Sequence, residues 1–167
     1  MPYRNKVFVS FDGDNDIHYY RLMKAWKQND NTSFNFYDAH DINVALDSST
    51  EMTIKRRLSE RLSNSKVFIS LIGESTRYLY KFVRWELEQA VKRDLPIIGV
   101  NLNGLRTYDE NRCPPAIRES LAIYVNYKPR ILQHALEYWP SQHINFKKQG
   151  KSGPYYFTDD VYRRFGL

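Results

Sequence analysis

The sequence predicts an α/β domain in which a doubly wound sheet of five parallel strands, in the order 2-1-3-4-5, is followed by a C-terminal extension. The predicted strands are continuous apolar runs, which is typical of strands buried on both faces of a parallel sheet. Segments of about 11 to 16 residues with helical spacing separate them, as expected for helices that cover such a sheet. A length of 167 residues with 42% hydrophobic residues suits one globular domain.

The first strand and helix are predicted from the start of the chain. Residues 6–11, Lys-Val-Phe-Val-Ser-Phe, form a short run rich in β-branched and aromatic residues, so they are predicted to form a strand. Residues 12–16 contain three aspartates and a glycine, which is typical of a turn whose carboxylates can cap a helix. Apolar residues then recur at helical spacing over residues 17–27, and this spacing predicts the first helix.

The second and third strands follow the same alternation. Residues 34–38 are the second strand candidate, and a long polar connection occupies residues 39–50. A helix is predicted from Thr50 to about Asn64, because apolar residues recur every three or four positions. The apolar run at residues 66–72 then predicts the third strand.

The remaining elements are predicted on the same grounds. Residues 79–94 have the spacing of a helix, and residues 95–102 form the fourth apolar run. A fifth strand is predicted at residues 121–125 and a helix at residues 129–138, and residues 155–165 are expected to form a final helix or an arm. The arrangement is flavodoxin-like, and in such sheets ligands bind beyond the carboxyl ends of the strands.

We therefore predict one domain spanning residues 1–167, with a core at about 5–128 and an extension at about 129–167. Twenty-five Lys and Arg against 19 Asp and Glu give a net charge of +6. The basic residues are scattered, so no nucleic-acid partner is expected. A single cysteine, Cys113, excludes an internal disulfide and a multi-cysteine zinc site. We find neither a signal-peptide core nor an apolar run long enough to span a membrane, and expect a cytoplasmic protein.

The turn after the first strand permits another interpretation. A hydrophobic strand followed by Asp-x-Asp is the haloacid-dehalogenase pattern, in which Asp12 would be the nucleophile and Asp14 the acid. That chemistry needs magnesium, held by further carboxylates after a later strand. The predicted fourth strand ends without a carboxylate, and the four histidines are dispersed, so no metal site is predicted. A magnesium-dependent phosphatase stays as a third hypothesis beside a simple capped turn.

Glu86 is the anomaly of the predicted helix 79–94. At about 100° per residue it lies at the edge of the apolar stripe rather than opposite it. The stripe consists of Leu79, Phe82, Val83, Leu87, Ala90 and Val91. A carboxylate there should be partly buried near the carboxyl ends of the strands, and buried carboxylates gather at functional sites. The structural alternative is a surface ion pair with Lys81, Arg84 or Arg93.

The same helix carries a family resemblance. The segment Phe82-Val-Arg-Trp-Glu86 resembles the aromatic-x-x-x-Glu signature of TIR domains that cleave NAD. The first strand with Asp16, the segment Phe36-Tyr-Asp38 and the segment Ile72-Gly-x-x-Thr76 also agree with the bacterial TIR-like family, which includes the TIR protein of Thoeris anti-phage defence. The resemblance covers roughly residues 5–104. One departure is Phe82, where many TIR enzymes carry Trp.

The resemblance implies an NAD+ nucleosidase that uses NAD+ as its substrate and needs no cofactor. It would release nicotinamide and make an ADP-ribose-derived signal, cyclic or conjugated, that diffuses to a downstream effector. Glu86 would stabilise the positive charge that develops on the ribose. The resemblance also implies self-association through the TIR domain. The implied substrate-binding residues are Ser10, Phe11, Asp12, Asp38, Gly73, Thr76 and Phe82.

A different class of function stays open beside the enzyme. Many TIR domains act as assembly modules that bind other TIR domains and catalyse nothing. An assembly module has no need for a carboxylate at the edge of an apolar stripe, and this favours the enzyme. Release of nicotinamide from NAD+ is the observation that separates the two hypotheses.

Overall fold

The computed structural model describes residues 6–28, 36–38 and 50–167, and it contains one sheet of parallel strands. The strands are ordered β2-β1-β3-β4-β5-β6. The predicted order of the first five is confirmed, and a sixth strand is added beside β5. Their bounds are β1 Val7–Ser10, β2 Phe36–Asp38, β3 Val67–Ile72, β4 Ile97–Asn101, β5 Ala122–Asn126 and β6 Pro154–Tyr156.

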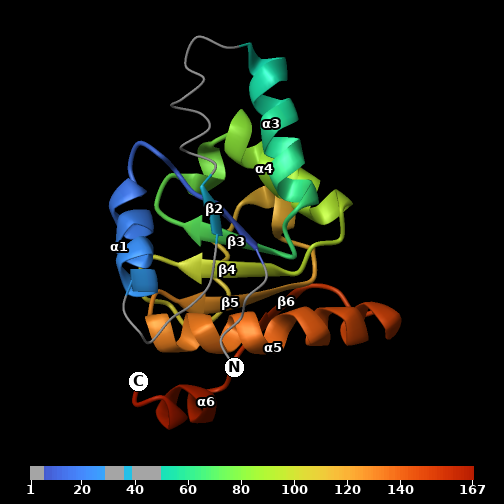
Figure 1. The fold of residues 1–167 in the computed structure, drawn as a ribbon. Coiled ribbons are helices and arrows are strands. Elements are labelled where there is room, and N and C mark those ends of the chain that lie inside the picture. Colours follow the sequence, from blue (N-terminus) through green and yellow to red (C-terminus); the bar gives the residue numbers. More distant parts are fainter. Residues whose placement is uncertain (1–5, 29–35, 39–49) are drawn as a thin grey trace.

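Helices cover both faces of this sheet (Figure 1). The α-helices are α1 Ile17–Gln28, α3 Glu51–Ser63, α4 Phe82–Lys92, α5 Pro129–Lys148 and α6 Asp159–Arg164, and the short 3₁₀ helices are η1 Thr76–Tyr78 and η2 Pro115–Ile117. One buried cluster joins the sheet to α1, α5 and α6, and the other joins it to α3, α4 and η2. The result is the three-layer arrangement that the continuous apolar strands predicted.

Alternation along the strands decides which layer each residue enters. In β1, Val7 and Val9 belong to the cluster under α1 and α5, whereas Phe8 belongs to the cluster under α3 and α4. Every residue of β1 and β3 is buried, because helices lie over both faces. The polar Ser10, which ends β1, therefore faces the α4 layer by the same alternation.

The predicted helix at residues 79–94 begins later than expected. Residues 76–78 form η1, and α4 begins at Phe82. Leu79 ends η1 with extended backbone angles, so it precedes α4 although it still packs against the cluster under α3 and α4. The buried stripe of α4 consists of Val83, Glu86, Leu87 and Ala90.

The last 40 residues form a long helix, a short strand and a short helix. Helix α5 was predicted to end at residue 138, which is wrong: it continues to Lys148 with Pro140 inside it. Trp139 is fully buried and His143 nearly so, so the buried face continues through the proline and outweighs its cost. Residues 150–153 then lead into β6, which pairs with β5 and was not predicted. The helix expected within residues 155–165 forms at Asp159–Arg164 as α6. No helix among the described residues combines the length and apolarity needed to cross a bilayer.

Candidate functional site

The turn after β1 is organised by one carboxylate. Asp12 is buried, and its Oδ1 accepts hydrogen bonds from the backbone N–H groups of Asp14, at 3.0 Å, and Asn15, at 3.3 Å. Its Oδ2 accepts a third from the Asn15 side chain at 2.7 Å. Both carboxylate oxygens are therefore engaged within the turn, and Asp14 points to solvent. This is the capped turn, not the geometry of a phosphatase nucleophile.

The loop after β3 is held by Thr76. The Gly73 N–H donates to Thr76 Oγ1 at 2.8 Å, and the Thr76 hydroxyl approaches the Leu71 carbonyl at 3.4 Å. Thr76 is buried, so its hydroxyl shapes the loop from within. The structure thus gives this residue, predicted to bind substrate, a contact that fixes the backbone of Gly73.

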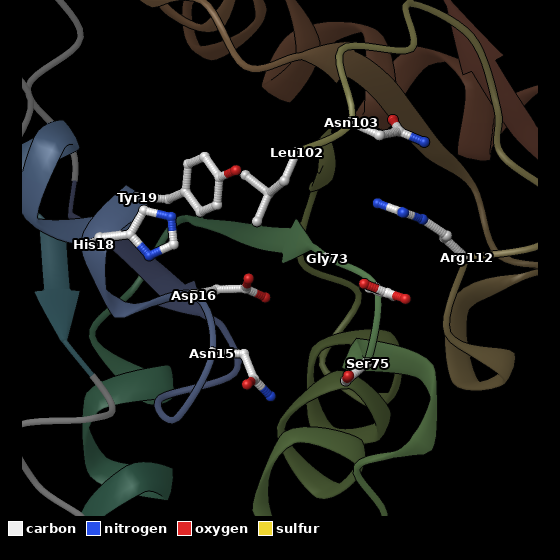
Figure 2. Close-up of a pocket in the computed structure, with 10 residues that line it drawn as sticks. Asn15, Asp16, His18, Tyr19, Gly73, Ser75, Leu102, Asn103 and Arg112 are labelled. Atoms are coloured by element: carbon white, nitrogen blue, oxygen red, sulfur yellow. The ribbon is translucent and has the colours of Figure 1, made fainter.

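A cavity of about 420 Å³ lies beyond the carboxyl ends of β1, β3 and β4. It occupies the edge of the sheet at which ligands bind in doubly wound folds. Figure 2 shows the side chains of Asp16 and Arg112 pointing into it from opposite sides, with His18 and Tyr19 on the α1 side. The lining residues are Asn15, Asp16, His18, Tyr19, Gly73, Glu74, Ser75, Leu102, Asn103 and Arg112.

Asp16 forms the buried wall of the cavity. Its side chain packs so closely on Gly73 that a Cβ atom added there would lie 2.2 Å from Asp16 Oδ2. The residue is 7% exposed, and Oδ2 has no hydrogen-bond partner among the described residues. Burial raises the pKa of the Asp16 carboxyl, and the nearby Asp12 raises it further, whereas His18 and Arg112 act in the opposite direction. The fold therefore tolerates an unfavourable charge at this position.

Replacing Asp16 with Asn should raise the melting temperature at neutral pH, because a neutral amide avoids the cost of burying a charge. A raised folded-state pKa means that the wild-type penalty is fully present above that pKa. The penalty vanishes as the pH falls toward the ordinary carboxyl value of 3.8, where the folded and unfolded states are both protonated. Thermal melts of both proteins from pH 4 to pH 8 should therefore converge at the acidic end. A stability difference that grows on acidification would contradict this account.

Arg112 forms the basic wall, and a loop after β4 presents it. Asp109 organises that loop: its Oδ1 accepts from the N–H groups of Asn111, at 2.9 Å, and Arg112, at 3.1 Å, and its Oδ2 accepts from the Asn103 amide at 2.9 Å. The Arg112 side chain is half-buried. Its guanidinium makes no hydrogen bond or ion pair with any residue that the structure describes. The loop backbone is therefore fixed, and the Arg112 guanidinium has N–H donors that no described residue uses.

Glu86 is 1% exposed and lies on the face of α4 that packs onto the sheet. The predicted burial of this carboxylate is confirmed. Ser10 of β1 and Ser70 of β3 are paired in register, and both side chains are buried. Alternation directs both toward the α4 layer, since Phe8 and Phe68 two residues earlier lie in that cluster. Three buried polar side chains, Ser10, Ser70 and Glu86, therefore share the layer between α4 and the sheet.

Two of the cations considered as surface partners for Glu86 have other contacts. Arg84 pairs with Glu88, with Nε 2.9 Å from Oε1, on the exposed side of α4. Arg93 donates to the hydroxyls of Ser59, at 2.5 Å, and Ser63, at 2.8 Å, which joins α4 to α3.

The other predicted residues are distributed around this edge of the sheet. Gly73 lines the cavity, whereas Phe11 stacks on Tyr20 in the core with ring centroids 4.8 Å apart. Phe82 is half-buried at the first turn of α4, beneath the Lys81 ammonium group. Asp38 ends β2, where its backbone pairs with β1, and its side chain lies outside the described part of the chain. Glu86 does not line the cavity.

The cavity residues that sequence reasoning did not assign to the site are chiefly Asp16 and Arg112. Asp16 appeared in the sequence as a helix-capping aspartate, and its position directly after a predicted strand was the available signal. Arg112 lies in a loop without periodicity, and no local pattern marks it. The described residues contain no group of three or more His, Cys, Asp or Glu side chains placed to hold a metal ion.

Comparison with known proteins shows a match to one protein family. The family model described as "Thoeris protein ThsB, TIR-like domain" matches residues 8–107, which is more than half of the chain's 167 residues. Among solved structures, the chain is similar to a conserved protein from Enterococcus faecalis V583. That similarity has 13% sequence identity and a TM-score of 0.49, and it covers 95% of this chain and 94% of the other.

Proposed function

The chain belongs to the TIR-like domain family of the Thoeris protein ThsB, and from this premise we propose that it cleaves NAD+ and releases nicotinamide. The remaining ADP-ribose would leave as a cyclic or conjugated signal in anti-phage defence and reach an effector by diffusion. NAD+ is the substrate in this reaction, and no further cofactor is required. The proposal places the chain in the cytoplasm, where NAD+ is available.

The observation that carries the proposal is the burial of Glu86. The Glu86 carboxylate is 1% exposed on a helix face shared with Val83, Leu87 and Ala90, so it is shielded from water. Electrostatic interactions are stronger there than in water, so one negative charge can act strongly on a nearby positive one. Carboxylates buried in this way are enriched at functional sites.

The chemistry of NAD+ cleavage suits a single carboxylate. Nicotinamide leaves the cationic riboside as a neutral molecule, so no general acid is needed for its departure. Positive charge develops instead at the ribose carbon from which it departs. A fixed carboxylate stabilises that charge by electrostatics and can accept a hydrogen bond from a ribose hydroxyl. This is the role we assign to Glu86.

Nicotinamide release provides the direct test. Purified protein is incubated with NAD+ at several protein concentrations, and nicotinamide and the ADP-ribose products are separated by chromatography. The proposal predicts that nicotinamide appears in proportion to the NAD+ consumed. The chromatographic position of the second product distinguishes linear, cyclic and conjugated ADP-ribose.

Self-association is measured in the same samples by light scattering, because TIR domains also serve as assembly modules. We propose that this chain assembles through its TIR domain and that assembly accompanies activity. The samples are also measured after addition of an extract of phage-infected cells, which would supply a trigger of activity. If the chain then assembles but releases no nicotinamide, the result favours the non-catalytic scaffold.

A further inference from the structure

We propose that Asp16 and Arg112 hold one ribosyl phosphate unit of the substrate in the cavity beyond β1, β3 and β4, with Arg112 on the phosphate and Asp16 on a ribose hydroxyl. The identity of the ligand as a part of NAD+ rests on the proposed function. The placement of the two charges rests on the cavity itself. Neither residue is among the substrate-binding residues that the family resemblance implied.

The first argument is that Asp16 and Arg112, which have opposite charges, face the same space without bonding to each other; the Glu74 carboxylate also lines this space. Asp16 is more than nine-tenths buried, and its Oδ2 has no hydrogen-bond partner among the described residues. Arg112 acts on the Asp16 carboxyl through its electrostatic field, and the two described side chains form neither a hydrogen bond nor an ion pair with each other. Both line the cavity of about 420 Å³, and Figure 2 shows their side chains on opposite sides of it. Burying the Asp16 carboxylate without a hydrogen-bond partner on Oδ2 is costly, so a ligand hydroxyl that donates to it would relieve that cost.

The second argument is the chemistry of the two groups. A guanidinium presents a planar fork of N–H donors that matches two oxygens of a phosphate. A buried carboxylate after a strand of a doubly wound sheet accepts hydrogen bonds from ribose hydroxyls, as the acidic residue of dinucleotide sites does. A ribosyl phosphate has a phosphate and ribose hydroxyls within one small unit. It can therefore bind Arg112 through the phosphate and Asp16 through a hydroxyl at the same time.

The third argument is the rest of the lining. His18 and Tyr19 lie together on the α1 side, with ring centroids 4.1 Å apart, and provide a ring-bearing wall beside the charged groups. Asn103 and Ser75 add neutral polar groups at the rim. The volume lies within the range of about 300–1,000 Å³ that is usual for small-molecule sites. A nucleotide combines a planar base, a diol and a phosphate, and this lining offers a partner for each.

The cavity and Glu86 have separable tasks. Glu86 is not among the residues that line the cavity, and it lies on the buried face of α4. Substitutions at Asp16 or Arg112 should therefore weaken binding of NAD+ and raise KM, with a smaller effect on kcat. Substitution of a residue with a purely structural role would instead lower stability without raising KM selectively.

The test is binding of ADP-ribose, which has the ribosyl phosphate but no nicotinamide to lose. Isothermal titration calorimetry is performed on the full chain and on Arg112→Gln, Arg112→Lys and Asp16→Asn. We expect affinity to fall by about 10- to 100-fold in Arg112→Gln and Asp16→Asn, the range for a lost hydrogen bond to a charged group. Arg112→Lys should recover part of it, because the charge returns without the planar fork.

Two controls make the result specific. Arg163→Gln removes the same charge from α6, where Arg163 pairs with Asp160 on the surface, and it should leave affinity unchanged. Adenosine, which lacks the phosphate, should bind Arg112→Gln and the wild-type chain equally well. Melting curves confirm that each variant is folded, and because Arg112 is half-buried in a loop fixed by Asp109, we expect no loss of fold.

The outcomes separate this inference from the proposed function. Arg112-dependent binding of ADP-ribose without NAD+ cleavage would support the cavity and count against the enzyme. NAD+ cleavage with an unchanged KM in Arg112→Gln and Asp16→Asn would support the enzyme and overturn the cavity assignment. Failure of the wild-type chain to bind ADP-ribose would likewise overturn it.

Discussion

Replacing Glu86 with Gln should lower the rate of nicotinamide release from NAD+ by about 100- to 1,000-fold, the usual effect of removing one preorganised electrostatic contact. Gln keeps the size of the side chain and its capacity for hydrogen bonds, and it removes only the negative charge. We expect the variant to remain folded and to bind ADP-ribose as the wild type does, because Glu86 does not line the cavity. Activity is measured under the conditions in which the wild-type chain is active, on the same preparation used for thermal melting.

Glu88→Gln is the matched control. Glu88 lies two residues away on α4, it is about half exposed, and it pairs with Arg84 at the surface. An exposed i,i+4 pair contributes about 0.3–0.5 kcal/mol, so this change should alter neither activity nor melting temperature measurably. If Glu86→Gln instead loses stability and retains full activity per folded molecule, Glu86 is a structural residue and the catalytic assignment is wrong.

Gly73→Ala should destabilise the domain by about 1–3 kcal/mol and weaken ADP-ribose binding, because a methyl group at residue 73 cannot be accommodated beside Asp16. The added Cβ would lie 2.2 Å from Asp16 Oδ2 and 2.8 Å from both Asp16 Cγ and Oδ1. Asp16 is buried against this loop, and the Gly73 N–H is bonded to Thr76, so neither side can move freely. Chemical denaturation measures the loss of stability, and calorimetry measures binding.

A double variant tests the cause. Asp16→Ala removes all three atoms that the new methyl group would meet, so Asp16→Ala combined with Gly73→Ala should recover most of the stability that Gly73→Ala loses. Binding should not recover, because the carboxylate that we assign to the ribose is gone. Additive losses of stability would show that the two residues do not interact, since neighbouring sites in contact couple and distant ones do not.

Local patterns predicted most of the fold because this sheet is buried on both faces. Strands such as β1 and β3 must be apolar throughout, and the helices between them need an apolar stripe, so both leave a clear signal in the sequence. The same reasoning predicted the burial of Glu86, because helical spacing alone sets the angle between a side chain and the stripe. The family resemblance over residues 5–104 was equally local, and the matching family model spans nearly the same residues.

The C-terminal part was less predictable. Strand β6 is three residues long with mostly exposed side chains, so it has no apolar run, and it is a strand because its backbone bonds to β5. Helix α5 passes through Pro140, a residue that ordinarily ends a helix. The packing of Trp139 and its neighbours against the sheet outweighs that local cost.

The sequence by itself determined the parallel sheet and the buried carboxylate on α4, because each leaves a periodic pattern within one segment. The order of the first five strands followed from the fold class that the alternation of strands and helices indicated. Only the tertiary structure decided that Asp16, Gly73 and Arg112 form one cavity. These residues come from three loops, and they meet because parallel strands direct their carboxyl ends to the same edge of the sheet. The side chain that reaches that space depends on loop backbones. Asp12, Thr76 and Asp109 fix those backbones by local hydrogen bonds, and such bonds leave no periodic pattern in the sequence.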